Sequence, residues 1–156
     1  MSVLYFEDLE VGQTFATDSL QIGAEDIKAF AAEYDPQPFH LDEAAARQSL
    51  FGSLAASGWH TAALTMRLLV AGAFRPAGGI VGSGGELSWK LPVRPGDTLH
   101  VETEILERRP SRSRPRHGLV RVRVTTFNQA GEAVQTFSPT LLVLRREAAP
   151  PLSDTP

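Results

Sequence analysis

The chain has 156 residues, of which 42% are apolar and 21% charged, and its formal net charge is −3. These values fit one soluble globular domain, and no apolar run reaches the roughly 18 residues that a membrane span needs. The lack of cysteine excludes disulfides, a thiolate nucleophile and zinc–thiolate sites. The N-terminus has no basic segment followed by an apolar one, so we expect a cytoplasmic protein with no membrane partner.

Charge is unevenly distributed along the chain. Residues 1–43 contain ten acidic residues and one base, Lys28, whereas residues 108–123 contain seven arginines and no acid. Such a run usually marks a solvated surface, here a hairpin, and phosphate binding is the alternative. With an isoelectric point near 5.8 and no recognition motif, the chain is not expected to bind nucleic acid.

The first predicted elements are a strand and a helix. Residues 13–22 fit a strand. Residues 24–34 fit a helix, because apolar residues recur at helical spacing and two acids occupy the first turn, where the helix dipole favours them. Pro36 ends this helix, since the residue before a proline is pushed out of the helical region. Residues 35–41 are therefore predicted to be a loop.

Two further helices follow this loop. Asp42 is the expected N-cap of a short helix over residues 43–48. The stretch 57–74 is apolar on nearly every side and contains one charged residue, Arg67. A helix of this kind should be buried nearly all round, so it is the predicted centre of the core.

From Gly79 onward the apolar period changes from 3.6 to 2, which predicts strands. The alternating segments are residues 87–93, 99–105, 120–125 and 133–146. The connections between them, at residues 94–97, 109–118 and 128–131, fit hairpin turns. An α+β fold follows, in which a curved antiparallel sheet of about five strands wraps around the apolar helix. Residues 148–156 are rich in proline and are predicted to be a disordered tail.

The stretch with the clearest chemical potential is Asp35-Pro36-Gln37-Pro38-Phe39-His40. Proline fixes its own backbone and restricts the residue before it, so this segment can hold a carboxylate and an imidazole in a fixed relation. Acid–base catalysis requires such a relation, and histidine is a natural proton-transfer group. A structural role stays open on spacing alone, with Asp35 capping a turn and His40 packing beside Phe39.

These residues also resemble a known family. The stretch 34–42, with Ala46 six residues after His40, is similar to the signature of MaoC-like (R)-specific enoyl-CoA hydratases. That signature reads aspartate, any residue, asparagine, proline, any residue, histidine, and a small residue six positions later. Residues 5–13 and 93–99 resemble other segments of the family. The resemblance implies a single hot-dog domain over residues 1–147, with an antiparallel sheet wrapped around a long buried helix.

The resemblance implies hydration of a trans-2-enoyl-CoA to an (R)-3-hydroxyacyl-CoA, or the reverse dehydration. Asp35 and His40 would hold the water and move protons, and the backbone N–H of Gly58 would polarise the thioester carbonyl. Residues near these positions are candidates for substrate contact: Gln37, Ser57, Trp59 and His60. Arginine binds phosphate through forked donors, which gives three candidates for the coenzyme A phosphates: Arg112, Arg114 and Arg116.

The chain departs from the family pattern at two positions, with Gln37 in place of asparagine and Ser57 where many members have histidine. His60 is expected to be a buried, hydrogen-bonded residue near the site rather than a catalyst. Phe51, Phe74 and Trp59 are candidates for the walls of an acyl pocket. The resemblance implies no metal or redox cofactor, an acyl-CoA substrate, and a homodimer or dimer of dimers. Two alternatives stay open: a non-catalytic protein that binds acyl thioesters, and a hot-dog thioesterase.

Overall fold

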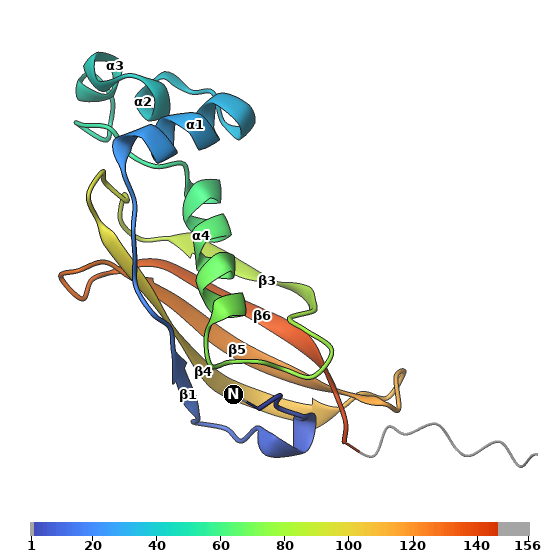
Figure 1. Ribbon diagram of the computed structural model, residues 1–156. Helices are drawn as coiled ribbons and strands as arrows, with labels where there is room; N and C mark the ends of the chain where they lie inside the picture. Colours follow the sequence, from blue (N-terminus) through green and yellow to red (C-terminus); the bar gives the residue numbers. More distant parts are fainter. Residues whose placement is uncertain (1, 147–156) are drawn as a thin grey trace, which may run out of the picture.

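The structure is a computed structural model that describes residues 2–146. It consists of one antiparallel sheet, a long helix lying across it and three short helices at one end (Figure 1). The helices are the 3-10 helix η1 (Phe6–Asp8), α1 (Ala24–Tyr34), α2 (Pro38–Leu41), α3 (Glu43–Arg47) and α4 (Gly58–Ala71). The strands are β1 (Thr14–Ala16), β2 (Leu20–Gln21), β3 (Gly82–Trp89), β4 (Thr98–Pro110), β5 (His117–Phe127) and β6 (Ala133–Leu144). The predicted tail lies outside the described residues.

The sheet has six strands in the order β1-β4-β5-β6-β3, with β2 also paired to β4. Strands β4, β5 and β6 follow one another as the predicted hairpins. The prediction that residues 94–97 form a hairpin turn was wrong, because β3 pairs with β6 at the other edge of this meander. The connection from β3 to β4 therefore crosses the end of the sheet. Alternation fixes which side chains share a face, but it does not select the neighbouring strand.

The predicted strand over residues 13–22 is interrupted. Both of its halves, β1 and β2, pair with β4, but residues 17–19 separate them. The Thr17 hydroxyl accepts a hydrogen bond from the Val101 amide at 3.0 Å, so a side chain replaces a ladder carbonyl at this point.

Helix α2 replaces part of the predicted loop. Pro36 does end α1 near Tyr34, but Pro38 then begins one further helical turn. Proline is favoured at the first helical position, where its missing N–H leaves no partner unsatisfied and its fixed φ suits the helix. The turn matters for the site because it carries His40 inward. Helix α3 begins after Asp42 as predicted, and the Asp42 carboxylate accepts from the Ala45 amide at 2.8 Å.

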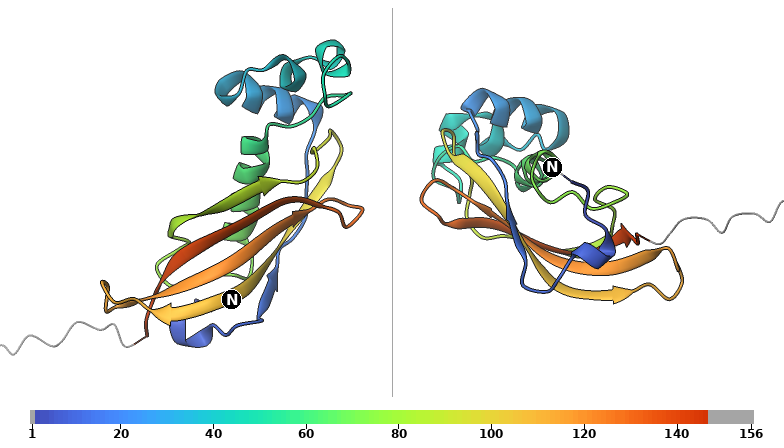
Figure 2. Two further views of the ribbon diagram at one scale, coloured as in Figure 1. Left: turned by 180° about the vertical axis from the view of Figure 1, so that it is seen from behind. Right: turned by 60° about the horizontal axis from the view of Figure 1, so that its bottom comes forward.

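Helix α4 packs against one face of the sheet, and the opposite face carries no α-helix among the described residues (Figure 2). The core lies between them, where the inward residues of β4 and β5 alternate as predicted. The prediction that the helix is buried on nearly every side was wrong for the single chain. Trp59, Met66 and Val70 are 59%, 38% and 63% exposed, because the sheet and α1 cover the other sides only. None of the helices in residues 2–146 is long and apolar enough to cross a membrane.

Candidate active site

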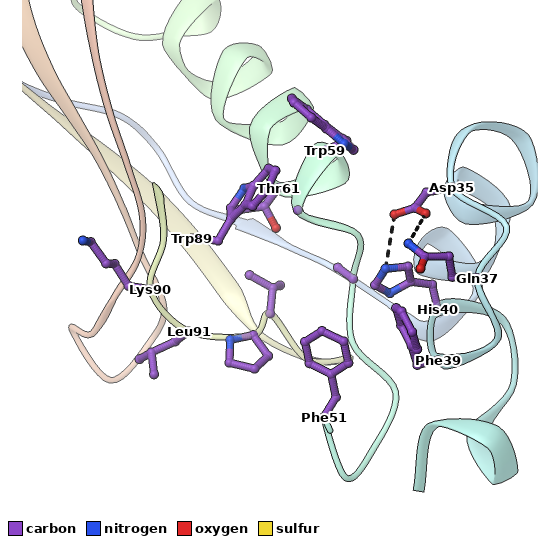
Figure 3. Close-up of a pocket in the computed structure, with 14 residues that line it drawn as sticks. Asp35, Gln37, Phe39, His40, Phe51, Trp59, Thr61, Trp89, Lys90 and Leu91 are labelled. Carbon is purple, nitrogen blue, oxygen red and sulfur yellow. Dashed lines mark hydrogen bonds and ion pairs between the residues drawn. The ribbon is translucent and has the colours of Figure 1, made fainter. Parts of the chain in front are cut away.

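A cavity of about 480 Å³ opens between the short helices, the N-terminal end of α4 and the end of β3 (Figure 3). Residues from four separate parts of the chain line it: Asp35, Gln37, Phe39, His40, Phe51, Ala56, Gly58, Trp59, Thr61 and residues 89–93. The structure therefore gathers five of the predicted site residues around one space. These are Asp35, Gln37, His40, Gly58 and Trp59. Phe51 also lies in the wall, as predicted for an acyl pocket.

Asp35 and His40 face each other across the turn that joins α1 to α2. The Nε2 atom of His40 lies 3.2 Å from Oδ2 of Asp35, and both side chains are largely shielded from solvent. Phe39 packs edge-on against the imidazole, with ring centroids 4.6 Å apart. A carboxylate and an imidazole at this distance, in partly apolar surroundings, can pass a proton between each other and a bound water.

The second nitrogen of His40 fixes the orientation of the ring. Nδ1 lies 2.6 Å from the carbonyl oxygen of Ala55. Since a carbonyl only accepts hydrogen bonds, Nδ1 must carry the proton that fills this bond. The other nitrogen, Nε2, is then the atom that gains or loses a proton on the side of Asp35.

The Asp35 carboxylate is hydrogen-bonded at both oxygens. Ser57 donates its hydroxyl to Oδ2 at 2.7 Å, and the Gln37 amide donates to Oδ1 at 2.6 Å. Burial acts to raise the pKa of Asp35, but these two hydrogen bonds and the charge of His40 outweigh it and hold the pKa below its ordinary value of 3.8. Asp35 is therefore an ionised carboxylate at neutral pH.

Ser57 links this carboxylate to helix α4. It is the N-cap of the helix, and its Oγ accepts from the Trp59 amide at 3.2 Å while donating to Asp35. The next residue, Gly58, lines the cavity. As the first residue of the helix it has an N–H without an intrahelical partner, and no hydrogen bond of the described chain uses it. The amide is thus free to stabilise a negative oxygen in the cavity.

Gly58 also has a packing role. A Cβ atom at this position would lie only 2.4–2.7 Å from ring carbons of Trp89. No side chain fits there unless the indole moves, so glycine is required by the close approach of β3. In this geometry Gly58 can serve both as a packing residue and as an amide donor.

Arg94 holds the loop over residues 51–57 in place. Its guanidinium donates to the carbonyl oxygens of Phe51 at 2.6 Å and Ser53 at 2.8 Å. This loop supplies Phe51, which lines the cavity, and the Ala55 carbonyl oxygen, which accepts the hydrogen bond from His40 Nδ1. Arg94, in the connection between β3 and β4, therefore supports the Asp35–His40 pair from outside the cavity.

Several predicted site residues lie elsewhere. His60 does not line the cavity. Its ring stacks on Phe30 with centroids 4.5 Å apart, and the expected hydrogen bond is missing, since no described residue offers a partner to the buried Nδ1. Phe74 lines a separate apolar cavity of about 300 Å³ between α4 and the sheet. The three arginines proposed for phosphate binding, residues 112, 114 and 116, lie in the β4–β5 connection, at the end of the sheet remote from the site (Figure 1).

Much of the solvated-hairpin reading of the arginine stretch agrees with the structure. Arg121 and Arg123 project from the outer face of β5 and pair across the strands with Glu107 and Glu104, at 3.7 and 3.2 Å. Sequence reasoning missed the contribution of β3 to the cavity. No signal in the sequence could have placed β3 there, because alternation is the same whichever strand is its neighbour. No group of three or more histidine or acidic side chains able to hold a metal ion occurs in residues 2–146.

Comparison with known structures identifies the fold. The crystal structure of a MaoC-like dehydratase from Rhodospirillum rubrum superposes with a TM-score of 0.89 at 57% sequence identity, over 92% of this chain and 98% of that one. The predicted fold class is confirmed: this is a hot-dog domain, with six antiparallel strands where about five were expected.

Sequence comparison identifies the family. A family model described as a MaoC like domain matches residues 7–128. The 3-hydroxybutyryl-CoA dehydratase of Methylorubrum extorquens is 35% identical over 154 residues, which cover 98% of this chain and 92% of that protein. The (R)-specific enoyl-CoA hydratase of Aeromonas caviae is 40% identical over 100 residues, or 64% of this chain and 72% of that protein. The chain therefore belongs to the MaoC-like dehydratase family.

Proposed function

We propose that the protein adds water to trans-2-enoyl-CoA thioesters to give (R)-3-hydroxyacyl-CoA, or catalyses the reverse dehydration. The observation that carries this proposal is the pairing of His40 Nε2 with the Asp35 carboxylate at 3.2 Å, in a cavity that also holds the free amide of Gly58. The names of two relatives, a hydratase and a dehydratase of this chemistry, support the same reaction.

The proposed hydration runs through an enolate. A water hydrogen-bonded to Asp35 and His40 gives up a proton to this pair as its oxygen forms a bond to C3 of the substrate. The electron pair of the C2–C3 double bond moves toward the thioester oxygen, where the Gly58 N–H stabilises the negative charge. The pair then returns a proton to C2, which completes the product. The chemistry calls for no metal or redox cofactor, and coenzyme A enters as part of the substrate.

The arrangement of donors around Asp35 favours this role over a non-catalytic one. The two positions that depart from the family pattern, Gln37 and Ser57, both donate to the carboxylate and keep it ionised. Neither of them blocks the cavity beside His40. At both positions, therefore, the residue that differs from the family pattern still donates a hydrogen bond to the Asp35 carboxylate.

We also propose that the chain acts as a homodimer. Trp59, Met66 and Val70 form an exposed apolar stripe along α4, and β3 is an edge strand whose outer side is unpaired in the described chain. Exposed edges and apolar stripes of this kind are usually covered in native proteins. Trp59 belongs to the stripe and also lines the cavity, so a partner chain would sit beside the substrate. The contact with coenzyme A phosphates stays a proposal for Arg112, Arg114 and Arg116. Because these arginines lie far from the cavity of their own chain, they could reach only a coenzyme A bound in the cavity of a partner chain.

One assay separates the proposed reaction from the alternatives. The protein is incubated with crotonyl-CoA while enoyl absorbance and free thiol are followed together. We expect loss of the enoyl signal without thiol release, and formation of the (R)-3-hydroxy product by chiral analysis. Thiol release would instead indicate a thioesterase. Binding of the thioester without loss of either signal would indicate a non-catalytic acyl-thioester protein.

A further inference from the structure

Three neighbouring strands place a tryptophan, a glutamine and a threonine opposite one another on the inner face of the sheet. Trp89 of β3 lies opposite Gln135 of β6, and Gln135 lies opposite Thr126 of β5. Gln135 is only 1% exposed and Thr126 is fully buried. A buried glutamine amide has two N–H donors and one acceptor oxygen, and each of these groups costs free energy if it has no hydrogen-bond partner.

Helix α4 supplies the remaining partner. The hydroxyl of Thr65 donates to the Thr61 carbonyl oxygen, one turn back, at 2.8 Å. This uses its single proton, so its other two contacts must be accepted hydrogen bonds. Thr126 therefore donates to it at 2.6 Å, and Gln135 Nε2 donates to it at 3.2 Å.

The direction of these bonds orients the glutamine. Because Thr65 can only accept from Gln135, the amide nitrogen must face the helix and the amide oxygen must face the other way. That oxygen accepts from the indole N–H of Trp89 at 3.0 Å. The indole is thus held at its nitrogen by a buried chain of hydrogen bonds and packed at its ring carbons against Gly58.

We propose that Gln135 is a positioning residue that fixes Trp89 as the cavity wall beside Gly58 and thereby sets how tightly the acyl thioester binds. Trp89 stands at the end of an edge strand and is half exposed, and its ring packs against Gly58 and edge-on against Trp59, with ring centroids 5.1 Å apart, a contact that phenylalanine at position 59 can retain. A connected buried network of this kind favours one arrangement of its side chains. While the Gln135 amide accepts the indole N–H, the Trp89 ring cannot rotate away from Gly58 and widen the cavity. The kinetic part of this inference rests on the proposed function, whereas the positioning of Trp89 does not.

Fluorescence tests the positioning without reference to activity. A Trp59→Phe background leaves Trp89 as the one tryptophan, since the chain has two. In that background we expect Gln135→Met, and separately Thr65→Val, to shift the Trp89 emission to the red and to increase its quenching by acrylamide. Thr65→Val is nearly isosteric and keeps the test valid if Gln135→Met does not fold. Thr103→Val is the matched control, because Thr103 is a buried hydroxyl of the same sheet for which no described residue is a partner.

Kinetics test the consequence for binding. Loss of one buried hydrogen bond should raise KM for the enoyl-CoA by about three- to ten-fold and change kcat little, because the wall does not touch the proton-transfer pair. In a Trp89→Phe background, which lacks the indole donor, Gln135→Met should add no further change in KM. Unchanged Trp89 fluorescence in both network variants, or KM effects that multiply in the double variant, would overturn the proposal. If the wild-type protein shows no hydratase activity, the proposed function fails and the fluorescence result still decides the positioning.

Discussion

His40 is held between the carbonyl oxygen of Ala55, 2.6 Å from Nδ1, and the carboxylate of Asp35, 3.2 Å from Nε2. The carbonyl fixes the ring and the carboxylate completes a pair that can share one proton. We expect Asp35→Asn and His40→Ala each to lower kcat by about 10²–10⁴-fold, the usual contribution of a positioned acid or base. The measurement is steady-state crotonyl-CoA hydration, with circular dichroism to show that the fold is kept.

His100→Ala provides the control for this pair, because His100 lies on β4 outside the cavity. Its activity should match that of the wild type. Near-full activity in either Asp35→Asn or His40→Ala would contradict the assignment of the catalytic pair.

Ser57 couples the stability of α4 to the ionisation of Asp35. Ser57→Ala removes an N-cap and a hydrogen bond to the carboxylate, so we expect a loss of about 1 kcal/mol in unfolding free energy. Because the folded pKa of Asp35 is lowered, its contribution to stability is present above the unfolded pKa and is lost as the pH falls through the folded value. In Ser57→Ala the folded pKa of Asp35 should rise toward the unfolded value, so the loss should be smaller and should be complete at a higher pH.

Urea unfolding across the acid range measures both effects of the Ser57 substitution. Ser57→Thr keeps the hydroxyl and should retain most of the stability and the wild-type acid dependence. An Ser57→Ala curve parallel to that of the wild type at every pH would show that the serine does not influence Asp35.

Gln37 is exposed, yet its amide reaches Asp35 Oδ1 at 2.6 Å. Gln37→Asn is one methylene shorter and should lower kcat by about three- to ten-fold, through loss of one hydrogen bond to a charged group. Gln37→Glu places a second carboxylate beside Asp35, which should raise the pKa of Asp35 and lower kcat further. Because the side chain is exposed, both variants should keep the fold, as shown by circular dichroism. Equal kcat in the wild type, Gln37→Asn and Gln37→Glu would show that Gln37 does not contribute to catalysis.

His60 should make stability depend on pH near neutrality. Burial lowers the pKa of His60, an effect that Asp26 partly opposes, so the folded state favours the neutral ring. Its contribution to stability is therefore complete above the unfolded pKa, about 6.5, and is lost as the pH falls toward the lower folded value. His60→Phe keeps the stack on Phe30 and removes the titration. We expect a flatter dependence of unfolding free energy between about pH 7 and pH 5 in this variant, and activity near that of the wild type.

From the exposed apolar stripe of α4 we expect that a charged substitution there prevents formation of the proposed homodimer. Val70→Glu places a carboxylate on the apolar stripe of the proposed dimer contact and should convert the protein to monomers, measured by light scattering during gel filtration. Leu50→Glu is the matched control, since Leu50 is 99% exposed and lies away from α4. A Val70→Glu protein with the wild-type mass would place the interface elsewhere.

The sequence was informative about the Asp35–His40 pair because these two residues are close together in the chain. Asp35 and His40 are five residues apart on a segment stiffened by prolines, so their meeting depends on little else. Trp89 and Gly58 meet only because β3 lies next to β6 rather than β4, and alternation is the same for either neighbour. The position of His60 likewise depends on where α1 packs, since helical spacing gives the face of a side chain but not what covers it.

The hydrogen bonds from Arg94 to Phe51 and Ser53 span about forty residues of chain. Contacts between residues this far apart form only after the loop-closure entropy of the intervening chain has been overcome. The segment that orients His40 is also bonded to Asp35 through Ser57, but Arg94 can hold it only once the connection from β3 to β4 has docked. A chain that has formed its helices but not the complete sheet would carry Asp35 and His40 side by side with the imidazole free to turn. Recovery of activity on refolding would then require the docked β3–β4 connection and not the helices alone.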